Sequence, residues 1–215
     1  MIISIVSQKG GVGKSTVAIN LVLAMAGLPG KPDVALVDAD EQRSCLDTLA
    51  GHERGNLTLY AAPDKPHKTI EKLKHRVIVV DTPPHSHEVA YQAAAMSDLV
   101  IVPCQPSPLD VRAMATTVKA LEVIREKFNP GLQCRFLVNR ITPRTTLANE
   151  ISETLERIYP TVPVLETVLH DRQAYKQSLL SGLSVIEYDK RSPAAQEIGQ
   201  LLLEINATMK VETIK

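Results

Sequence analysis

The stretch SQKGGVGKST, residues 7–16, decides the fold because it follows an apolar, β-branched run and precedes a segment with helical spacing. Its glycines allow the backbone to curl so that amide groups point at phosphate oxygens, with a helix N-terminus behind them. Lys14 can reach the outer phosphates of a nucleotide, and Ser15 can bind magnesium. The alternative is a turn that binds no nucleotide, and the order of strand, loop and helix argues against it. The predicted nucleotide-binding residues are Gly10, Gly11, Val12, Gly13, Lys14, Ser15 and Thr16.

Short β-branched runs alternate with segments of helical apolar spacing along the chain. The expected strands are residues 2–7, 33–39, 57–61, 76–81, 99–104, 135–139 and 162–169. The expected helices are residues 16–26, 88–96, 110–128, 149–159 and 194–209. This alternation predicts an α/β fold with a doubly wound, mostly parallel sheet and helices on both faces. Ligands of such sheets bind at the carboxyl ends of the strands.

Acidic residues stand where two of the expected strands end. Asp38 and Asp40 are two residues apart, so they point the same way along an extended chain. Asp81 closes the apolar run RVIVVD, where an unpaired buried charge would be costly. It fits the Walker B acid that holds magnesium through water, whereas Asp38 and Asp40 could instead cap the following helix. The candidate metal-site residues are Ser15, Asp38, Asp40 and Asp81.

The composition narrows the class of protein. The 215 residues include 24 basic and 24 acidic side chains, so a polyanionic partner would need a local basic patch. Cys45, Cys104 and Cys134 are far apart and lack metal-ligand spacing, so we expect incidental or buried thiols. The sequence shows no signal peptide and no apolar run of membrane-spanning length. We expect a single cytoplasmic domain, residues 1–215, with no membrane partner.

The loop departs from the general pattern G-x-x-x-x-G-K-[ST], because Gln8 replaces the first glycine and Lys9 follows it. KGGVGKS resembles the deviant Walker A loop of the family that contains the partition ATPases (ParA), the division-site ATPase MinD and the nitrogenase iron protein. PSPLD, residues 106–110, and the run 169–188 resemble the small ParF-type partition ATPases. In that run the matching residues are Arg172, Tyr175, Ser178, Gly182 and Val185. The resemblance implies that the N-terminal helix-turn-helix of longer partition ATPases is absent.

The resemblance implies an ATPase that uses ATP and Mg²⁺. Lys9 would cross a dimer interface to the phosphates of the partner's nucleotide, and the alternative is a solvent-exposed lysine. Asp40 would position the attacking water. Asn139 and Arg140 would lie near the adenine, although strand-end asparagines are also common turn residues. The candidate catalytic residues are Lys9, Lys14 and Asp40.

The resemblance also implies a partition cycle. ATP would close a nucleotide-sandwich homodimer, the dimer would bind nonspecific DNA of the nucleoid, and a small centromere-binding protein would stimulate slow hydrolysis. Arg144, Arg172 and Lys176 are candidate DNA contacts, with Arg172 the first choice, and scattered solubilising charges are the alternative reading.

Other functions on the same scaffold are disfavoured. The alternative is a MinD-like switch on a membrane surface, but the last eight residues, TMKVETIK, are short and polar for an amphipathic anchor. An iron–sulfur protein would need a cysteine pair in glycine-rich loops. An ATP-dependent ligase would need substrate-binding residues that we cannot identify in the sequence.

Overall fold

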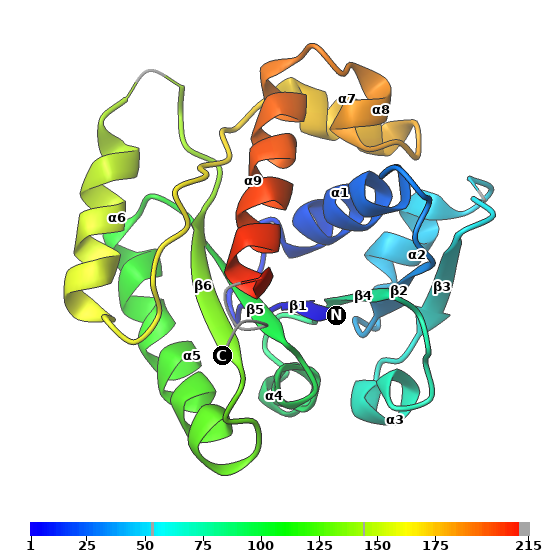
Figure 1. Ribbon diagram of the computed structural model, residues 1–215. Coiled ribbons are helices and arrows are strands. Elements are labelled where there is room, and N and C mark those ends of the chain that lie inside the picture. The colour runs from blue at the N-terminus through cyan, green and yellow to red at the C-terminus, as the bar shows by residue number, and fades with distance from the viewer. Residues whose placement is uncertain (53, 144, 211–215) are drawn as a thin grey trace.

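The computed structural model describes residues 1–52, 54–143 and 145–210. The strands form one six-stranded parallel sheet in the order β3-β2-β4-β1-β5-β6. They are β1 (Ile2–Ile5), β2 (Val34–Asp38), β3 (Leu57–Ala61), β4 (Val77–Asp81), β5 (Leu99–Cys104) and β6 (Gln133–Val138). The helices are α1 (Lys14–Ala26), α2 (Ser44–Leu49), α3 (Pro66–Ile70), α4 (His87–Ala95), α5 (Pro108–Lys127), α6 (Leu147–Ile158), α7 (Gln173–Leu180), α8 (Val185–Tyr188) and α9 (Pro193–Lys210). The predicted α/β fold is confirmed (Figure 1).

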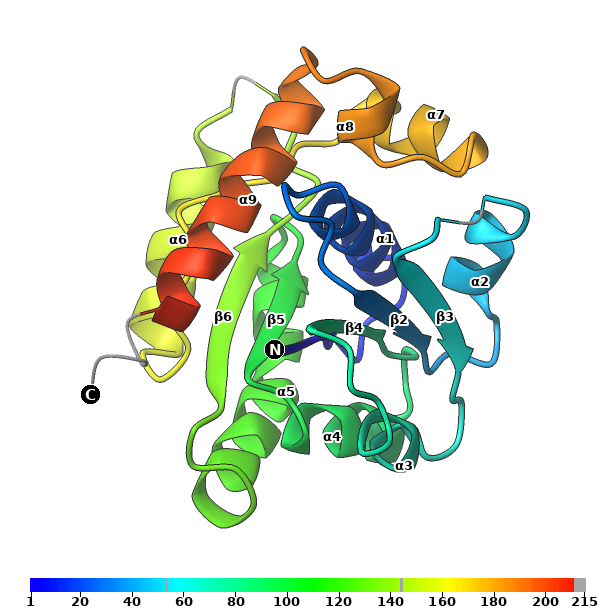
Figure 2. The same ribbon diagram turned by 45° about the vertical axis from the view of Figure 1, so that its right-hand side comes forward.

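Helices cover both faces of the sheet (Figures 1 and 2). Helices α1, α2, α7, α8 and α9 share one hydrophobic cluster with the side chains on one face of the sheet. Helices α3, α4, α5 and α6 contribute to two clusters on the other face. Strands β2, β4 and β5 are buried along their whole length. Such strands carry apolar side chains on both faces, which explains the unbroken apolar runs in the sequence.

The register of the sheet brings the polar strand ends together. Asp81, the last residue of β4, is level with Ile5 at the end of β1 and with Asp38 at the end of β2. The glycine-rich loop leaves β1 at this same edge. The carboxyl ends of three adjacent strands therefore supply the loop and two of the predicted acids to one place.

The predicted strand over residues 162–169 is wrong. This extended segment runs beside β6 and makes isolated parallel bridges, from Val164 to Phe136 and, just beyond the segment, from His170 to Ile141, instead of a continuous strand. Glu204 of α9 accepts hydrogen bonds from the backbone N–H groups of Glu166 and Thr167, at 2.6 and 3.0 Å. The β-branched run that predicted a strand is extended, and Leu165 is buried in the core. The backbone of the segment is shared between β6, which accepts from the Leu165 and Leu169 N–H groups, and the Glu204 side chain.

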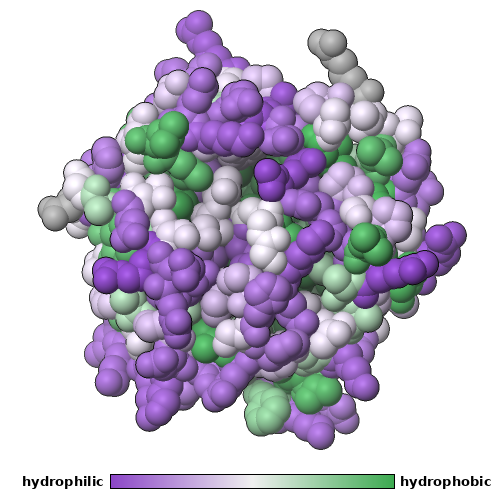
Figure 3. All heavy atoms as spheres, turned by 180° about the vertical axis from the view of Figure 1, so that it is seen from behind, coloured by the Kyte–Doolittle hydropathy of each residue, from purple (hydrophilic) through white to green (hydrophobic). Residues whose placement is uncertain are grey.

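The surface opposite the view of Figure 1 is mainly hydrophilic, with hydrophobic residues in small separate patches (Figure 3). The most exposed large apolar side chains belong to different elements: Leu109, Phe128, Leu180 and Leu203. Within the described residues, no helix combines the length and the apolar character needed to cross a bilayer.

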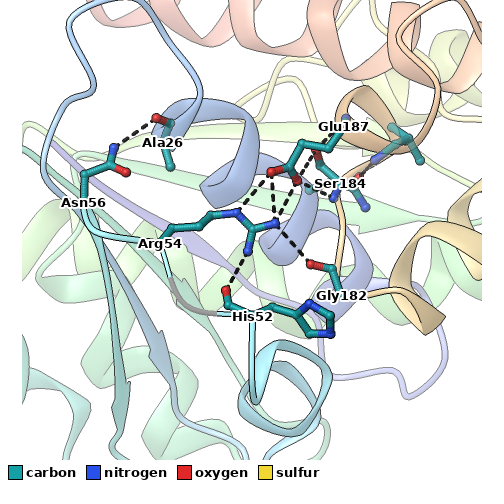
Figure 4. A network of polar contacts seen from close by, with 9 residues as sticks. Ala26, His52, Arg54, Asn56, Gly182, Ser184 and Glu187 are labelled. Carbon is teal, nitrogen blue, oxygen red and sulfur yellow. Dashed lines mark hydrogen bonds and ion pairs between the residues drawn. The ribbon is translucent and has the colours of Figure 1, made fainter.

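An ion pair joins the loop before β3 to α8, and a further hydrogen bond reaches the turn before α8 (Figure 4). Arg54 donates to the Glu187 carboxylate at 2.9 to 3.1 Å and to the carbonyl oxygens of His52 and Gly182. Gly182 has a φ of 62°, and a Cβ there would lie 2.1 Å from the His52 ring. Both the backbone conformation and the close approach therefore require glycine at this position.

We expect Gly182→Ala to lower the free energy of unfolding by about 1–3 kcal/mol, because it combines an unfavourable φ with a steric clash. Chemical denaturation followed by circular dichroism would measure the loss. Adding His52→Ala should restore part of it. Gly199→Ala is the control, since that helical glycine faces open space and alanine favours helix by roughly 1 kcal/mol. An unchanged stability of Gly182→Ala would contradict the packing described.

Candidate nucleotide-binding site

A pocket of about 410 Å³ opens at the carboxyl edge of the sheet. Its size suits a small ligand such as a nucleotide. The lining comes from the glycine-rich loop and the start of α1, the segment after β2, the end of β6 and the region around α7. The predicted site residues in this lining are Gly11, Gly13, Lys14, Ser15, Thr16, Asp40, Asn139, Arg140, Arg172 and Lys176. Residues from distant parts of the sequence thus converge on one pocket.

The loop conformation depends on two glycines. Gly11 and Gly13 have φ values of 75° and 94°, which L-residues with a side chain rarely adopt. A Cβ at Gly13 would lie 2.5 Å from Nδ2 of Asn139. The loop is therefore both left-handed and closely packed at Gly13, as an anion-binding turn before a helix requires.

Side chains from neighbouring strands hold the loop carbonyl groups from outside. Asn139 Nδ2 donates to the Val12 carbonyl oxygen at 2.7 Å. Gln105 and Arg140 both donate to the Gly11 carbonyl oxygen, at 2.9 and 2.7 Å. The position near the adenine that the resemblance implies for Asn139 stays a prediction, and in this structure its amide is bonded to the loop and to the Arg140 N–H. No local sequence pattern indicated that Gln105 would hold the loop.

Gln8, which replaces the Walker glycine, connects the loop to α4. Its Nε2 lies 2.8 Å from Nδ1 of His87 and donates to the Tyr91 hydroxyl at 2.9 Å. Because α4 follows the segment after Asp81, this contact couples the loop to the end of β4. No sequence pattern indicated either partner of Gln8.

Lys14 places a buried cation beside the pocket. The residue is 6% exposed, and its ammonium donates to the Lys9 carbonyl oxygen at 3.3 Å. Burial lowers the pKa of Lys14, whereas the nearby charges of Asp81 and Asp40 raise it. An ammonium group has further hydrogens to donate to phosphate oxygens.

Asp81 is fully buried beside the loop, and the set of donors around it fits magnesium. Its Oδ2 accepts a hydrogen bond from the Cys45 thiol at 3.2 Å, while Oδ1 is buried without a hydrogen-bond partner among the described residues. Burial raises the pKa of Asp81 to about 6, and hydrogen bonds from Ser15 and Cys45 oppose the increase. A carboxylate oxygen and a serine hydroxyl at one point are ligands that a hard cation prefers.

Asp38 and Asp40 have different environments. Asp38 is buried, and its carboxylate accepts from the backbone N–H groups of Asp40, Cys45 and Leu46, at 3.0 to 3.2 Å. Burial raises the pKa of Asp38, and these hydrogen bonds oppose the increase. Asp38 thus holds the start of α2. This is the helix-capping role that the sequence offered as the alternative to a metal site. Asp40 lines the pocket, and its role in positioning water stays a prediction.

Lys9 does not line the pocket of its own chain among the residues described. Its ammonium forms an ion pair with the carboxylate of Asp110, near the start of α5. Asp110 is 1% exposed, and its Oδ2 has no hydrogen-bond partner in the described part of the chain. The two lysines of the loop therefore face different groups.

Two of the predicted DNA contacts, Arg172 and Lys176, line the pocket. Arg172 is paired with the buried carboxylate of Glu197 at 2.7 Å, whereas Lys176 is more exposed and lies 4.0 Å from Asp171. Arg144 falls outside the described residues. No pattern in the chain indicated that Arg172 and Lys176 would line the same pocket as the glycine-rich loop.

Comparison with known proteins assigns the family. Residues 3–185 match the model of the CobQ/CobB/MinD/ParA nucleotide binding domain. The chain belongs to this family. It is a ParA/MinD-type P-loop ATPase, as the deviant Walker A loop indicated, and the narrower likeness to ParF-type proteins stays a prediction.

Two curated relatives match over nearly the whole chain. The maintenance of carboxysome distribution protein A of Halothiobacillus neapolitanus is 32% identical over 211 residues, which cover 94% of this chain and 95% of the relative. The chromosome-partitioning ATPase Soj of Thermus thermophilus is 26% identical over 242 residues, covering 97% and 96%.

Solved structures show the same fold. The ATP complex of a Cyanothece McdA variant superposes with a TM-score of 0.79 at 15% identity, covering 95% of this chain and 96% of that one. The Mg-ADP complex of the septum site-determining protein MinD from Pyrococcus horikoshii OT3 has a TM-score of 0.73 at 25% identity, covering 98% and 97%. These two relatives hold the types of ligand predicted for this pocket.

We expect Asp81→Asn to stabilise the nucleotide-free protein at pH 7, by up to about 3 kcal/mol. The folded-state pKa of Asp81, about 6, lies above its ordinary value of 3.8. Protonation therefore favours the folded state, and that contribution is lost as the pH rises through 6. Thermal unfolding should show a higher midpoint for the variant at pH 7 and a smaller difference at pH 5.

The same variant should no longer bind nucleotide more tightly when Mg²⁺ is added, because the asparagine carries no charge to hold the cation. A destabilisation of equal size at both pH values would contradict the electrostatic explanation and assign Asp81 a packing role.

Proposed function

We propose that this protein hydrolyses ATP with Mg²⁺ and uses the cycle to distribute an intracellular cargo on nucleoid DNA. The loop amides and Lys14 bind the phosphates, and Ser15 and Asp81 hold the magnesium ion. The bound ion neutralises charge on the phosphoryl group. Asp40, whose Oδ1 is fixed by the Gln42 N–H at 2.9 Å, orients the attacking water.

The observation that carries the proposal is the position of Lys9. The Lys9 ammonium lies next to the phosphate-binding loop but pairs with Asp110, and among the described residues Lys9 does not line the pocket of its own chain. In a face-to-face dimer it can act on the nucleotide of the partner, as the resemblance implies. A cation supplied in trans stabilises charge on the transferring phosphoryl group, in the manner of an arginine finger. ATP then becomes part of the dimer interface.

The cargo is proposed from the relatives. One relative is named for carboxysome distribution and another for chromosome partitioning, so their names point to two kinds of cargo, the carboxysome and the chromosome. A small DNA-bound partner protein that stimulates slow hydrolysis completes the proposed cycle. Arg144, Arg172 and Lys176 remain the candidate DNA contacts. Lys176 is favoured over Arg172 by its exposure and by its long, weak ion pair.

We expect Lys9→Ala to bind ATP with wild-type affinity and to fail to dimerise, because Lys9 lies outside its own pocket. Lys14→Ala should lose ATP binding altogether. Isothermal titration and analytical ultracentrifugation with and without ATP would separate the two effects. Loss of ATP affinity in Lys9→Ala would show that Lys9 acts within its own chain, against the proposal.

Binding to random-sequence duplex DNA and to anionic liposomes tests the function itself, each with ATP, with ADP and without nucleotide. We expect DNA binding with ATP alone, weakening as salt rises because phosphate contacts release counterions. Lys176→Glu should weaken it by about tenfold or more, whereas the control Lys119→Glu, an exposed charge on α5, should not. Binding to liposomes instead of DNA would replace the proposal with a membrane-surface switch.

A further inference from the structure

Glu197 of α9 is a buried carboxylate that several donors share. It accepts hydrogen bonds from the His170 backbone N–H at 3.3 Å and from the His170 ring at 2.8 Å. Arg172 donates to it through Nε, with Nη2 also at 2.7 Å, and the Tyr175 hydroxyl donates at 3.0 Å. One side chain thus fixes three residues of the segment that precedes and begins α7.

These three residues are part of the wall of the nucleotide pocket. His170, Arg172 and Tyr175 all line it, together with the apolar side chains of Leu169 and Ile198. The backbone of segment 162–171 makes isolated bridges beside β6. The Leu169 N–H donates to the Val138 carbonyl oxygen at 3.0 Å, and the Asp171 N–H donates to the Ile141 carbonyl oxygen at 2.9 Å. The backbone of the wall is thus held by β6 and by Ile141 just beyond it, whereas its polar side chains are held by Glu197 of α9.

The wall differs chemically from the glycine-rich loop. The loop offers amide groups and an ammonium to phosphates, whereas the wall offers aliphatic and aromatic surface with a few polar atoms. Apolar and planar side chains of this kind suit a base and a ribose rather than phosphate. When the loop binds the phosphates of a nucleotide, the base and the ribose can contact this wall.

We propose that Glu197 is a positioning residue of the nucleotide pocket, and that it sets affinity for the nucleoside part by holding His170, Arg172 and Tyr175 in place. The proposal rests on nucleotide binding by this pocket and is independent of DNA binding. It also gives Arg172 a role different from the predicted DNA contact, because its charge balances that of Glu197.

Helix α9 provides a matched control. Glu204 lies seven residues after Glu197, about two helical turns along the same face. Its carboxylate bonds the backbone N–H groups of Glu166 and Thr167, which do not belong to the described pocket lining. Both glutamates anchor the same extended segment to α9, but only Glu197 anchors the part that faces the pocket.

The test compares Glu197→Gln and Glu204→Gln with the wild type. Glutamine keeps the shape of the side chain but offers one acceptor oxygen in place of two and carries no charge for Arg172. We expect Glu197→Gln to weaken ATP and ADP binding by about tenfold, from the loss of one or two hydrogen bonds to a charged group. Inorganic tripolyphosphate, which lacks a nucleoside, should bind both variants as it binds the wild type. Glu204→Gln should lower the thermal midpoint without changing nucleotide affinity.

Unchanged ATP affinity of a folded Glu197→Gln would overturn the proposal and leave the ATPase assignment intact. Equal weakening of ATP and tripolyphosphate would also overturn it, since the effect would then be general. Failure of the wild type to bind ATP would remove the pocket assignment itself. If Glu197→Gln does not fold, Tyr175→Phe decides: it removes one donor and keeps the ring, and unchanged ATP affinity would count against the positioning role.

Discussion

The burial of Asp81 at the centre of the sheet is the constraint on which the site depends. The strand order places β4 between β1 and β2, so the last residue of β4 is covered on both sides. Neutral donors from Ser15 and Cys45 only partly compensate for the lost hydration, which is why the pKa of the carboxyl is raised. Lys14 is buried nearby with its own pKa lowered. Magnesium would supply the positive charge that Asp81 lacks beside it, and phosphate would supply the negative charge that Lys14 lacks. Ligand binding should therefore raise the free energy of unfolding.

A second feature of the molecule is the use of α9 as a partner for extended backbone. Beside β6, the segment before α7 bonds β6 and Ile141 through part of its backbone, and Glu197 and Glu204 bond other N–H groups of the same segment. The segment is thus held between β6 and α9, and its side chains form one wall of the pocket. The ion pair of Arg54 with Glu187 ties the far side of the same region to the loop before β3. The pocket thus has one side built on the glycine-rich loop and one side whose polar side chains are held by α9.

Much of the fold and of the candidate site could be predicted from the sequence, because these features depend on residues that are close together in the chain. The strand, the glycine-rich loop and Lys14 are contiguous, and strand ends carry Asp38, Asp40 and Asp81. The strand over residues 162–169 was predicted wrongly, since an extended segment buried on one side shows the same alternation as a strand. Patterns along the chain gave no sign of Gln105 or Glu197, because their partners lie far away in sequence. Gly11 and Gly13 were recognised by type, but the contact of Gly13 with Asn139 needed the tertiary structure.

The central claim is that Lys9 acts on the nucleotide of a second chain. The most direct measurement is a structure of the wild-type protein with Mg²⁺ and a non-hydrolysable ATP analogue, determined from a sample that is dimeric in solution. We expect the Lys9 ammonium to have left Asp110 and to lie within hydrogen-bond distance of a phosphate oxygen in the partner's pocket. A dimer in which Lys9 stays on Asp110, or bonds the nucleotide of its own chain, would contradict it.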